Sequence, residues 1–236
     1  MPIVRAHTKP KTAAALRDRR VASTRTSAPR SIGPWAFGAF ASLYDWQLPL
    51  ERAALRAAIE LAAPEPDELL LDVGTGTGAL LRELARRHPR PSHAVGIDSS
   101  PAMLEQAVAL PEGWQLRVAD ARRLPFADAT VDVVTCAYLI QLLDGVTRQA
   151  VLDEIARVLR PGGRVVIVSL VAARGLLGRA VLAPLTAAVC RAGGRPSGFC
   201  ALDPRPGLLL ASLAPQRGRW VTRGYPSFCV LARRHI

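Results

Sequence analysis

The stretch Leu69-Leu70-Leu71-Asp72-Val73-Gly74-Thr75-Gly76-Thr77-Gly78-Ala79 decides the fold. It begins with an apolar run that has one acid near its end, which is typical of a strand buried on both faces of a parallel sheet. Glycines follow at every second position, and a helical pattern begins at about residue 77. Glycines between a strand and a helix let the backbone approach a ligand closely. The stretch therefore predicts a ligand-binding strand–loop–helix unit.

The same alternation of strands and helices continues along the chain. Strands are expected at 93–98, 115–119, 131–136 and 164–170, and helices at 77–88, 101–110 and 147–159. Strands that alternate with helices predict a doubly wound, mostly parallel α/β sheet. Two more strands, at about 219–223 and 227–232, flank the turn Gly224-Tyr225-Pro226 and predict an antiparallel hairpin. The hairpin closes one edge of an expected seven-stranded sheet. Residues 35–63 are expected to be helical with a break near Pro49.

Charge divides the 236 residues into three parts. Residues 1–34 carry eight basic residues and one acidic, residues 35–170 thirteen and seventeen, and residues 171–236 ten and one. The net charges are therefore +7, −4 and +9. We expect a basic flexible tail at 1–34 and one domain at 35–236, with cap helices at 35–66, a cofactor-binding core at 67–170 and a C-terminal part at 171–236.

Basic flanks attract phosphate, whether on nucleic acid or on an anionic membrane surface. Only Lys9 and Lys11 are lysines, however, and this arginine bias favours an interpretation as G+C-rich coding. The Arg- and Ser-rich residues 1–34 also meet the loose criteria for a mitochondrial transit peptide, so that location stays open beside the preferred cytoplasmic one. The oligomeric state is not indicated.

Metal, disulfide and membrane-spanning classes are disfavoured. The four cysteines stand far apart with no Cys-x-x-Cys pair, and the four histidines form no ligand pattern, so no metal site is expected. Reduced thiols indicate a cytoplasmic setting. No apolar run approaches the roughly 20 residues of a membrane-spanning helix.

Three acidic residues end or directly follow successive predicted strands, and their positions indicate the kind of ligand. Gly74, Gly76 and Ala79 satisfy the dinucleotide pattern G-x-G-x-x-G/A, so NAD binding is an alternative. Asp72 before the loop suits a ligand with an ammonium group, and is unfavourable beside a pyrophosphate. Asp98 is placed for ribose hydroxyls, and Asp120 for an exocyclic adenine amine. Together they favour a nucleoside with a cationic amino-acid tail.

Four motifs in order resemble one family. They are Leu70–Gly78, the segment 95–104 (VGIDSSPAML), the segment 120–128 (DARRLPFAD) with VDVV behind it, and the segment 156–163 (ARVLRPGG). The chain resembles a class I S-adenosylmethionine-dependent methyltransferase with a Rossmann-like fold, of the branch that contains the ubiquinone/menaquinone-biosynthesis C-methyltransferases. The resemblance covers roughly residues 40–170. It implies S-adenosyl-L-methionine as cofactor and a small-molecule acceptor for methylation.

The resemblance also implies roles for individual residues. Asp72 would hold the methionine amino group, the glycine loop would lie under methionine and ribose, and Asp98 would bind the ribose hydroxyls. The implied cofactor-binding residues are Asp72, Gly74, Thr75, Gly76, Gly78, Asp98, Ser99, Met103, Asp120, Ala121 and Ala137. Catalytic residues stay unknown.

On the substrate side the candidates are Tyr44, Tyr138 and Gln141, with Gln141 equally expected as a solvated helix residue. The apolar segment 171–210 lies where the family builds the roof of the substrate pocket, and an apolar roof implies a quinone-, lipid- or secondary-metabolite-like acceptor. Completion of the core explains the same residues equally well. An RNA- or protein-directed methyltransferase that uses the basic tail, and a noncatalytic cofactor-binding adapter, stay open.

Overall fold

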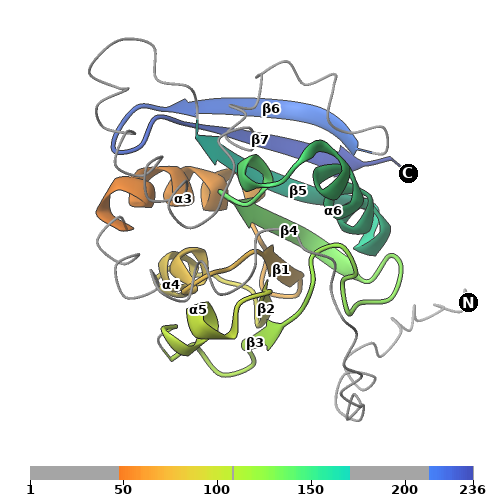
Figure 1. Cartoon of the computed structure of the whole chain (residues 1–236). Coiled ribbons are helices and arrows are strands. Elements are labelled where there is room, and N and C mark those ends of the chain that lie inside the picture. Colours follow the sequence, from red (N-terminus) through yellow and green to blue (C-terminus); the bar gives the residue numbers. More distant parts are fainter. Residues whose placement is uncertain (1–47, 108, 171–212, 236) are drawn as a thin grey trace, which may run out of the picture. The chain divides into compact units, whose positions relative to one another are not determined.

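The computed structural model describes residues 48–107, 109–170 and 213–235, which all belong to one compact unit of the chain, Ile32–Ile236. The strands form a single seven-stranded sheet in the order β3-β2-β1-β4-β5-β7-β6. They are β1 (Leu69–Val73), β2 (His93–Asp98), β3 (Gln115–Val118), β4 (Val131–Ala137), β5 (Leu159–Leu170), β6 (Leu213–Val221) and β7 (Ser227–Arg234) (Figure 1). The described helices are α3 (Leu48–Ala62), α4 (Ala79–Ala85), α5 (Pro101–Glu105), the short 3₁₀ helix η3 (Ile140–Leu142) and α6 (Gly145–Val158).

Strand directions confirm the predicted fold class. Strands β1 to β5 pair in parallel, whereas β7 pairs antiparallel with both β5 and β6. The hairpin of β6 and β7 therefore closes the sheet beyond β5. Because the carboxyl ends of β1 to β5 meet at one edge, the loops that follow these strands are brought together there. That edge carries the candidate site.

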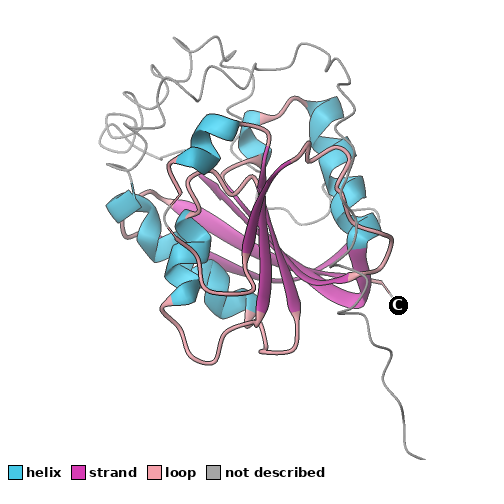
Figure 2. Ribbon diagram, turned by 90° about the horizontal axis from the view of Figure 1, so that it is seen from below, coloured by secondary structure: helices cyan, strands magenta, loops and turns pink. Residues whose placement is uncertain are grey.

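Helices cover both faces of the sheet, as Figure 2 shows. Helices α3 and α4 pack with Leu70 and Val133 in one hydrophobic cluster. Helix α6 packs with Leu71 and Val134 in a second cluster on the other face. Neighbouring strand residues alternate between the two clusters because side chains of a strand point to opposite faces. The sheet is thus buried on both sides, as the continuous apolar run of β1 predicts.

Several element boundaries differ from the prediction. Pro49 lies in the first turn of α3, where a helix needs no N–H donor, and the predicted break near it stays a prediction because the residues before Leu48 lie outside the described ones. Helix α4 begins only after Gly78, whose φ of 76° is left-handed. Strand β6 begins at Leu213, where Leu213 pairs with Arg234, six residues before its expected start at 219. In the described part of the chain, no helix has the length and apolarity to cross a bilayer.

A buried ion pair joins three elements at the amino-terminal edge of the sheet. Arg164 of β5 donates to both carboxylate oxygens of Glu68 (2.8 and 2.7 Å), just before β1, and also to the carbonyl oxygen of Ala63 (2.8 Å) after α3. The two charged side chains are only 11% and 8% exposed. The tail at 1–34 and the apolar segment 171–210 lie outside the described residues, so the predicted tail, cap start and roof remain predictions.

Candidate functional site

The glycine loop after β1 has a backbone that only glycine adopts easily. Gly74, Gly76 and Gly78 have φ angles of 72°, 56° and 76°. The N–H groups of Gly74 and Thr75 both donate to the carbonyl oxygen of Ile97 at 2.9 Å, so the loop is attached to β2. A Cβ atom at Gly74 would lie 2.9 Å from Cδ2 of Leu139. Gly74 is therefore required for two reasons: its φ angle is left-handed, and a Cβ atom there would clash with Leu139.

Asp72 is a buried carboxylate at the end of β1. Its side chain is 1% exposed, and its Oδ1 accepts a hydrogen bond of 2.7 Å from Oγ1 of Thr135 on β4. Burial raises the pKa of Asp72 to about 6 against the opposing effect of the Thr75 and Thr135 hydroxyls, and the charge of Asp98 raises it further. No ion pair of Asp72 is present within the described ranges, so its charge is not balanced there.

Thr75 adds an unsatisfied polar atom next to this carboxylate. Its Oγ1 is buried and lies near enough to influence the pKa of Asp72, yet it makes no hydrogen bond of good geometry to any described residue. Buried polar atoms without a partner are rare in folded proteins and are frequent at functional sites. The hydroxyl lies close to Gly96 of β2, where an added Cβ atom would be 2.8 Å from it.

Asp98 ends β2 and holds the same loop from the other side. Its two carboxylate oxygens accept the N–H groups of Gly76 and Ser100, each at 2.9 Å. Burial raises the pKa of Asp98 despite these bonds. Each carboxylate oxygen accepts about two hydrogen bonds, so acceptor sites remain for ligand hydroxyls. Ser99 beside it is exposed.

Asp120 follows β3 and is paired locally. The Arg122 guanidinium donates to both of its carboxylate oxygens, at 3.0 and 2.6 Å, and holds the pKa of Asp120 below its usual range. The Asp120 side chain is 45% exposed, in contrast to buried Asp72. An adenine amine would therefore share this carboxylate with Arg122, a neighbour that the sequence prediction did not include.

Of the remaining predicted cofactor residues, Met103 is buried, and its Cε would lie 3.2 Å from a Cβ atom at Gly76. Ala121 is half-buried at the start of the loop after β3, and Ala137 is half-buried at the end of β4. All three lie at the carboxyl edge or on α5 beside it. The structure thus brings the predicted set to one edge of the sheet, while their contacts with a cofactor remain predictions.

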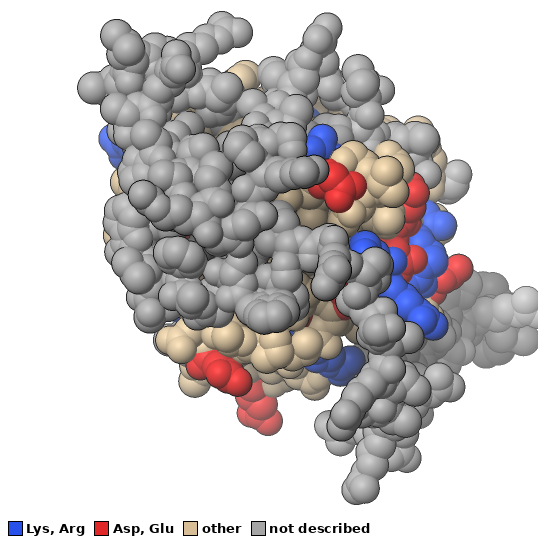
Figure 3. Space-filling model, viewed as in Figure 1, with Lys and Arg blue, Asp and Glu red and all other residues tan. Residues whose placement is uncertain are grey.

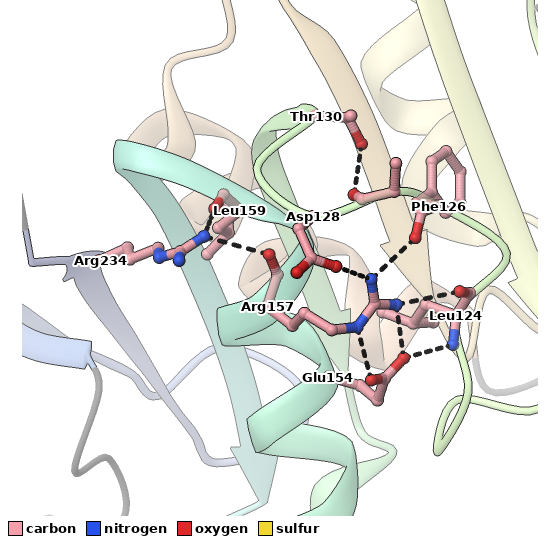
Figure 4. A network of polar contacts seen from close by, with 9 residues as sticks. Leu124, Phe126, Asp128, Thr130, Glu154, Arg157, Leu159 and Arg234 are labelled. Atoms are coloured by element: carbon pink, nitrogen blue, oxygen red, sulfur yellow. Dashed lines mark hydrogen bonds and ion pairs between the residues drawn. The ribbon is translucent and has the colours of Figure 1, made fainter.

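The segment after Asp120 is fixed on α6 by the network in Figure 4. Arg157 donates to the Phe126 carbonyl (2.9 Å) and to the Asp128 carboxylate (2.7 Å). Glu154 accepts from Arg157 Nε and from the Leu124 N–H, both at 2.7 Å. These contacts therefore attach the segment 120–128 to Arg157 of the motif 156–163 and to Glu154 just before it. Figure 3 shows that, among the described residues, basic and acidic side chains are interspersed at the right-hand side of the view.

The substrate-side candidates lie deeper than the sequence suggests. Tyr138 has a positive φ of 59°, its ring is buried, and its hydroxyl forms a 3.0 Å hydrogen bond with Oγ of Ser227. Gln141 is 3% exposed, and its Oε1 accepts the N–H of Leu170 at 2.6 Å. The solvated position considered for Gln141 is wrong, because Gln141 fixes the end of β5. Tyr44 lies outside the described residues.

Other chemistries find little support in the described part of the chain. Cys136 is fully buried, and burial raises the pKa of its thiol, as expected for an inert strand-end cysteine. His88 and His93 are exposed. Within the described residues, no three His, Cys, Asp or Glu side chains are arranged to hold a metal ion.

Thr135 is the site residue that sequence reasoning missed. Asp72 and Thr135 are direct neighbours in the register of β1 and β4. In the sequence, only its polarity distinguishes Thr135, because it is the one hydroxyl residue in the mostly apolar segment Val131–Ala137. Its partner could be assigned only once the register was known.

Comparison with known proteins agrees with this geometry. Residues 70–163 match the model of a methyltransferase domain. The ubiquinone/menaquinone biosynthesis C-methyltransferase of Desulfotalea psychrophila is 42% identical over 99 residues, which cover 41% of this chain and 39% of that protein. The malonyl-[acyl-carrier protein] O-methyltransferase of Hahella chejuensis is 34% identical over 135 residues, covering 56% and 47%. A solved S-adenosylmethionine-dependent methyltransferase from Aquifex aeolicus has a TM-score of 0.57 at 19% identity and covers 84% and 98%.

The core of the chain is therefore a class I S-adenosylmethionine-dependent methyltransferase domain. Within this class it is similar to the ubiquinone/menaquinone-biosynthesis C-methyltransferases. The chain spans about half the length, or less, of the curated relatives it matches. The predicted family and fold are thus confirmed for the domain.

Proposed function

We propose that the chain transfers the methyl group of S-adenosylmethionine to a small apolar or amphipathic acceptor, such as a quinone-, lipid- or secondary-metabolite-like compound. The observation that carries the proposal is the buried carboxylate of Asp72, which lies one loop away from Asp98. Asp72 has a raised pKa and no cationic partner in the described part of the chain.

The described residues fit this cofactor group by group. An ammonium group would balance the charge of Asp72, and ribose hydroxyls would use the remaining acceptor sites of Asp98. A dinucleotide would place a pyrophosphate near two carboxylates whose pKa values are already raised by burial. The NAD alternative is therefore disfavoured by charge.

The chain's own part in the reaction is to position the reactants. The cofactor supplies an electrophilic methyl group on a sulfonium, and proximity and orientation provide much of the lowering of the barrier for such a transfer. Ala137 and the turn at Tyr138 shape the donor end at the edge of β4. Because Tyr138 and Gln141 are used in internal hydrogen bonds, we assign them to shaping this edge and not to proton transfer.

The acceptor class rests on the relatives and on the sequence. Two matched relatives bear names for methyl transfer to quinone carbon and to an acyl-carrier-protein-bound malonyl group. Both names describe small acceptors, one of them attached to a carrier protein.

The test is methyl-labelled S-adenosylmethionine incubated with purified protein and an extract of its source cells. The label is then divided among lipid-soluble, small aqueous, RNA and protein fractions. We expect label in the lipid-soluble fraction with the wild type and much less with Asp98→Ala at limiting cofactor. Label in RNA or protein would instead support the basic tail as a recognition arm. No label, with S-adenosylhomocysteine still bound, would support a noncatalytic adapter.

A further inference from the structure

The turn that follows β4 has a strained backbone at Tyr138. Its φ of 59° lies in the left-handed region, which a bulky aromatic residue adopts only at an energetic cost. The ring is nevertheless buried, and the Tyr138 N–H donates to the carbonyl oxygen of Val168 on β5 at 2.8 Å. Such a conformation persists only where the surrounding structure holds it, and it is frequent at functional sites. The contacts of this turn therefore indicate what the strain serves.

A chain of hydrogen bonds holds the Tyr138 side chain. The hydroxyl oxygens of Tyr138 and Ser227 are 3.0 Å apart, and Ser227 Oγ donates to the carbonyl oxygen of Tyr225 at 2.8 Å. Because Ser227 has a single hydroxyl proton, the Tyr138 hydroxyl is the donor in the first bond. The Tyr225 N–H donates in turn to the carbonyl oxygen of Leu50 on α3 at 2.9 Å. We call Tyr138, Ser227 and Tyr225 the Tyr138 clamp.

The residue next to Tyr138 lies against the cofactor loop. A Cβ atom at Gly74 would be 2.9 Å from Cδ2 and 3.0 Å from Cβ of Leu139, so the Leu139 side chain closely approaches this glycine. On the β2 side, the Gly74 N–H donates to the carbonyl oxygen of Ile97. The first glycine of the loop is thus held between β2 and the turn after β4. Because Tyr138 and Leu139 are consecutive, a change of backbone at Tyr138 would displace Leu139 from Gly74.

A second side chain fixes the far end of the same turn. Gln141 Oε1 accepts the N–H of Leu170 at 2.6 Å, and Leu170 is the register partner of Ser227 in the pairing of β5 with β7. The side-chain bonds of Tyr138 and Gln141 therefore reach one pair of residues, where β5 ends and β7 begins. The turn is attached to the sheet on both sides of Leu139, which contacts the cofactor loop.

The cost of the left-handed backbone and the contribution of the hydroxyl bond have the same order of magnitude. Loss of the hydroxyl bond would therefore lower the population of the turn conformation seen in this structure. If only that conformation binds a ligand well, the apparent affinity falls with the fraction of molecules that adopt it.

We propose that Tyr138 and Ser227 are positioning residues for the cofactor loop. Their hydrogen bond keeps the turn left-handed, the turn keeps Leu139 against Gly74, and the loop thereby stays in the conformation that binds S-adenosylmethionine. Both residues act through Leu139 and are not assigned a contact with the cofactor. The inference rests on the proposed function, because it concerns the loop that we assign to this cofactor.

Four single variants test the proposal. Tyr138→Phe keeps the buried ring and removes only the hydroxyl, and Ser227→Ala removes the other side of the same bond. Leu139→Ala removes the contact with Gly74. Ser169→Ala is the matched control, because the Ser169 hydroxyl on β5 is also buried but makes no hydrogen bond within the described residues. Each protein is titrated with S-adenosylhomocysteine by calorimetry, and urea unfolding gives its stability. Heteronuclear NMR of the ligand-free protein follows the Gly74 amide signal.

We expect Tyr138→Phe and Ser227→Ala each to weaken S-adenosylhomocysteine binding by about three- to tenfold, the range for one neutral hydrogen bond. The double variant should lose about as much as the more affected single variant, because both substitutions remove the same bond. Ser169→Ala should change the affinity less than about twofold. The Gly74 amide signal should shift in the Tyr138, Ser227 and Leu139 variants and stay in place in Ser169→Ala.

Lower stability with unchanged affinity and an unchanged Gly74 signal would show a purely structural role and overturn the proposal. Additive losses in the double variant, or an equal loss in Ser169→Ala, would also overturn it. If the wild type does not bind S-adenosylhomocysteine, the proposed function fails, whereas the Gly74 signal still tests the positioning role in the free protein. If the wild type binds and all variants bind equally well, the proposed function stands and the positioning role fails.

Discussion

Replacing Asp72 with asparagine separates the energetic cost of a buried carboxylate from its use in binding. The side chain is 1% exposed, and burial raises its pKa from 3.8 to about 6. This difference corresponds to about 3 kcal/mol of folding free energy at neutral pH. The folded protein holds this proton more tightly than the unfolded chain. The group's stabilising contribution is therefore complete below pH 3.8 and is lost as the pH rises through about 6.

Asparagine does not titrate, so Asp72→Asn should remove this loss. We expect the cofactor-free variant to be more stable than the wild type at pH 8 by about 1–3 kcal/mol, where the upper value is the full cost of the charge. The Thr135 hydroxyl can still donate to the amide oxygen, and the Thr75 hydroxyl is near enough to accept from the amide nitrogen. The advantage should shrink towards zero at pH 4, where Asp72 is mostly protonated.

The assay is urea unfolding of wild type and variant at pH 4 to 8, with the difference in unfolding free energy plotted against pH. The difference is used because other carboxylates, such as Glu154 beside Arg157, have lowered pKa values and change stability in the opposite direction. Asp128→Asn, whose carboxylate is 76% exposed, is the control and should differ from wild type by less than about 0.5 kcal/mol.

The same proteins are then titrated with S-adenosylhomocysteine. Loss of a charge-assisted contact to the ligand's ammonium group should weaken binding by about 1.5–3 kcal/mol. The variant would thus be more stable and bind less well. A stability difference that does not change with pH, or a variant less stable than wild type at pH 8, would refute the account of Asp72.

Three further predictions concern other residues of the sheet, two at the candidate site and one at the opposite edge. Asp98→Ala should weaken binding of S-adenosylhomocysteine by about 1.5–3 kcal/mol in calorimetry, and unchanged affinity would contradict the site assignment. Thr135→Val should raise the pKa of Asp72 further, so that binding is lost at a higher pH than in wild type; Thr135→Ser should restore the profile, and identical profiles would exclude a positioning role. Arg164→Met should lower the unfolding free energy by about 3–5 kcal/mol because it leaves the buried Glu68 carboxylate with only the more distant Arg160 guanidinium (3.5 Å) and the Glu65 N–H as partners. A loss below about 1 kcal/mol in urea unfolding would contradict this.

The sheet could be predicted because its central strands are continuous apolar runs. Strands buried on both faces, such as β1 and β4, need apolar residues at every position, and this pattern is local in the sequence. The first six residues of strand β6 could not be predicted, because Pro215, Gln216 and Gly218 are weak strand formers. They are extended because they pair with β7, which is a long-range effect that overrides local preference.

The acids of the site could be predicted for a related reason. Carboxyl ends of parallel strands meet at one edge, so Asp72 and Asp98 had to lie near each other. The contacts of Thr135 and Gln141 could not be predicted, since they depend on strand register and on the unusual φ of Tyr138 between them. The Arg122 partner of Asp120 is local, but its conformation depends on the loop that Arg157 fixes.

Among the carboxylates whose pKa is shifted, both directions occur, and this contrast locates the site. Acids paired with arginine, such as Asp120 and Glu154, have lowered pKa values. Asp72, which is buried, and Asp98, which is half-buried, flank the glycine loop, and desolvation without a neighbouring cation in the described part of the chain raises their pKa values. An arginine at this position would relieve the cost but would also occupy the place of a cationic ligand. The loop therefore stays partly unsatisfied until a ligand with an ammonium group and hydroxyls binds. It follows that cofactor binding and folding stability are coupled at this edge of the sheet.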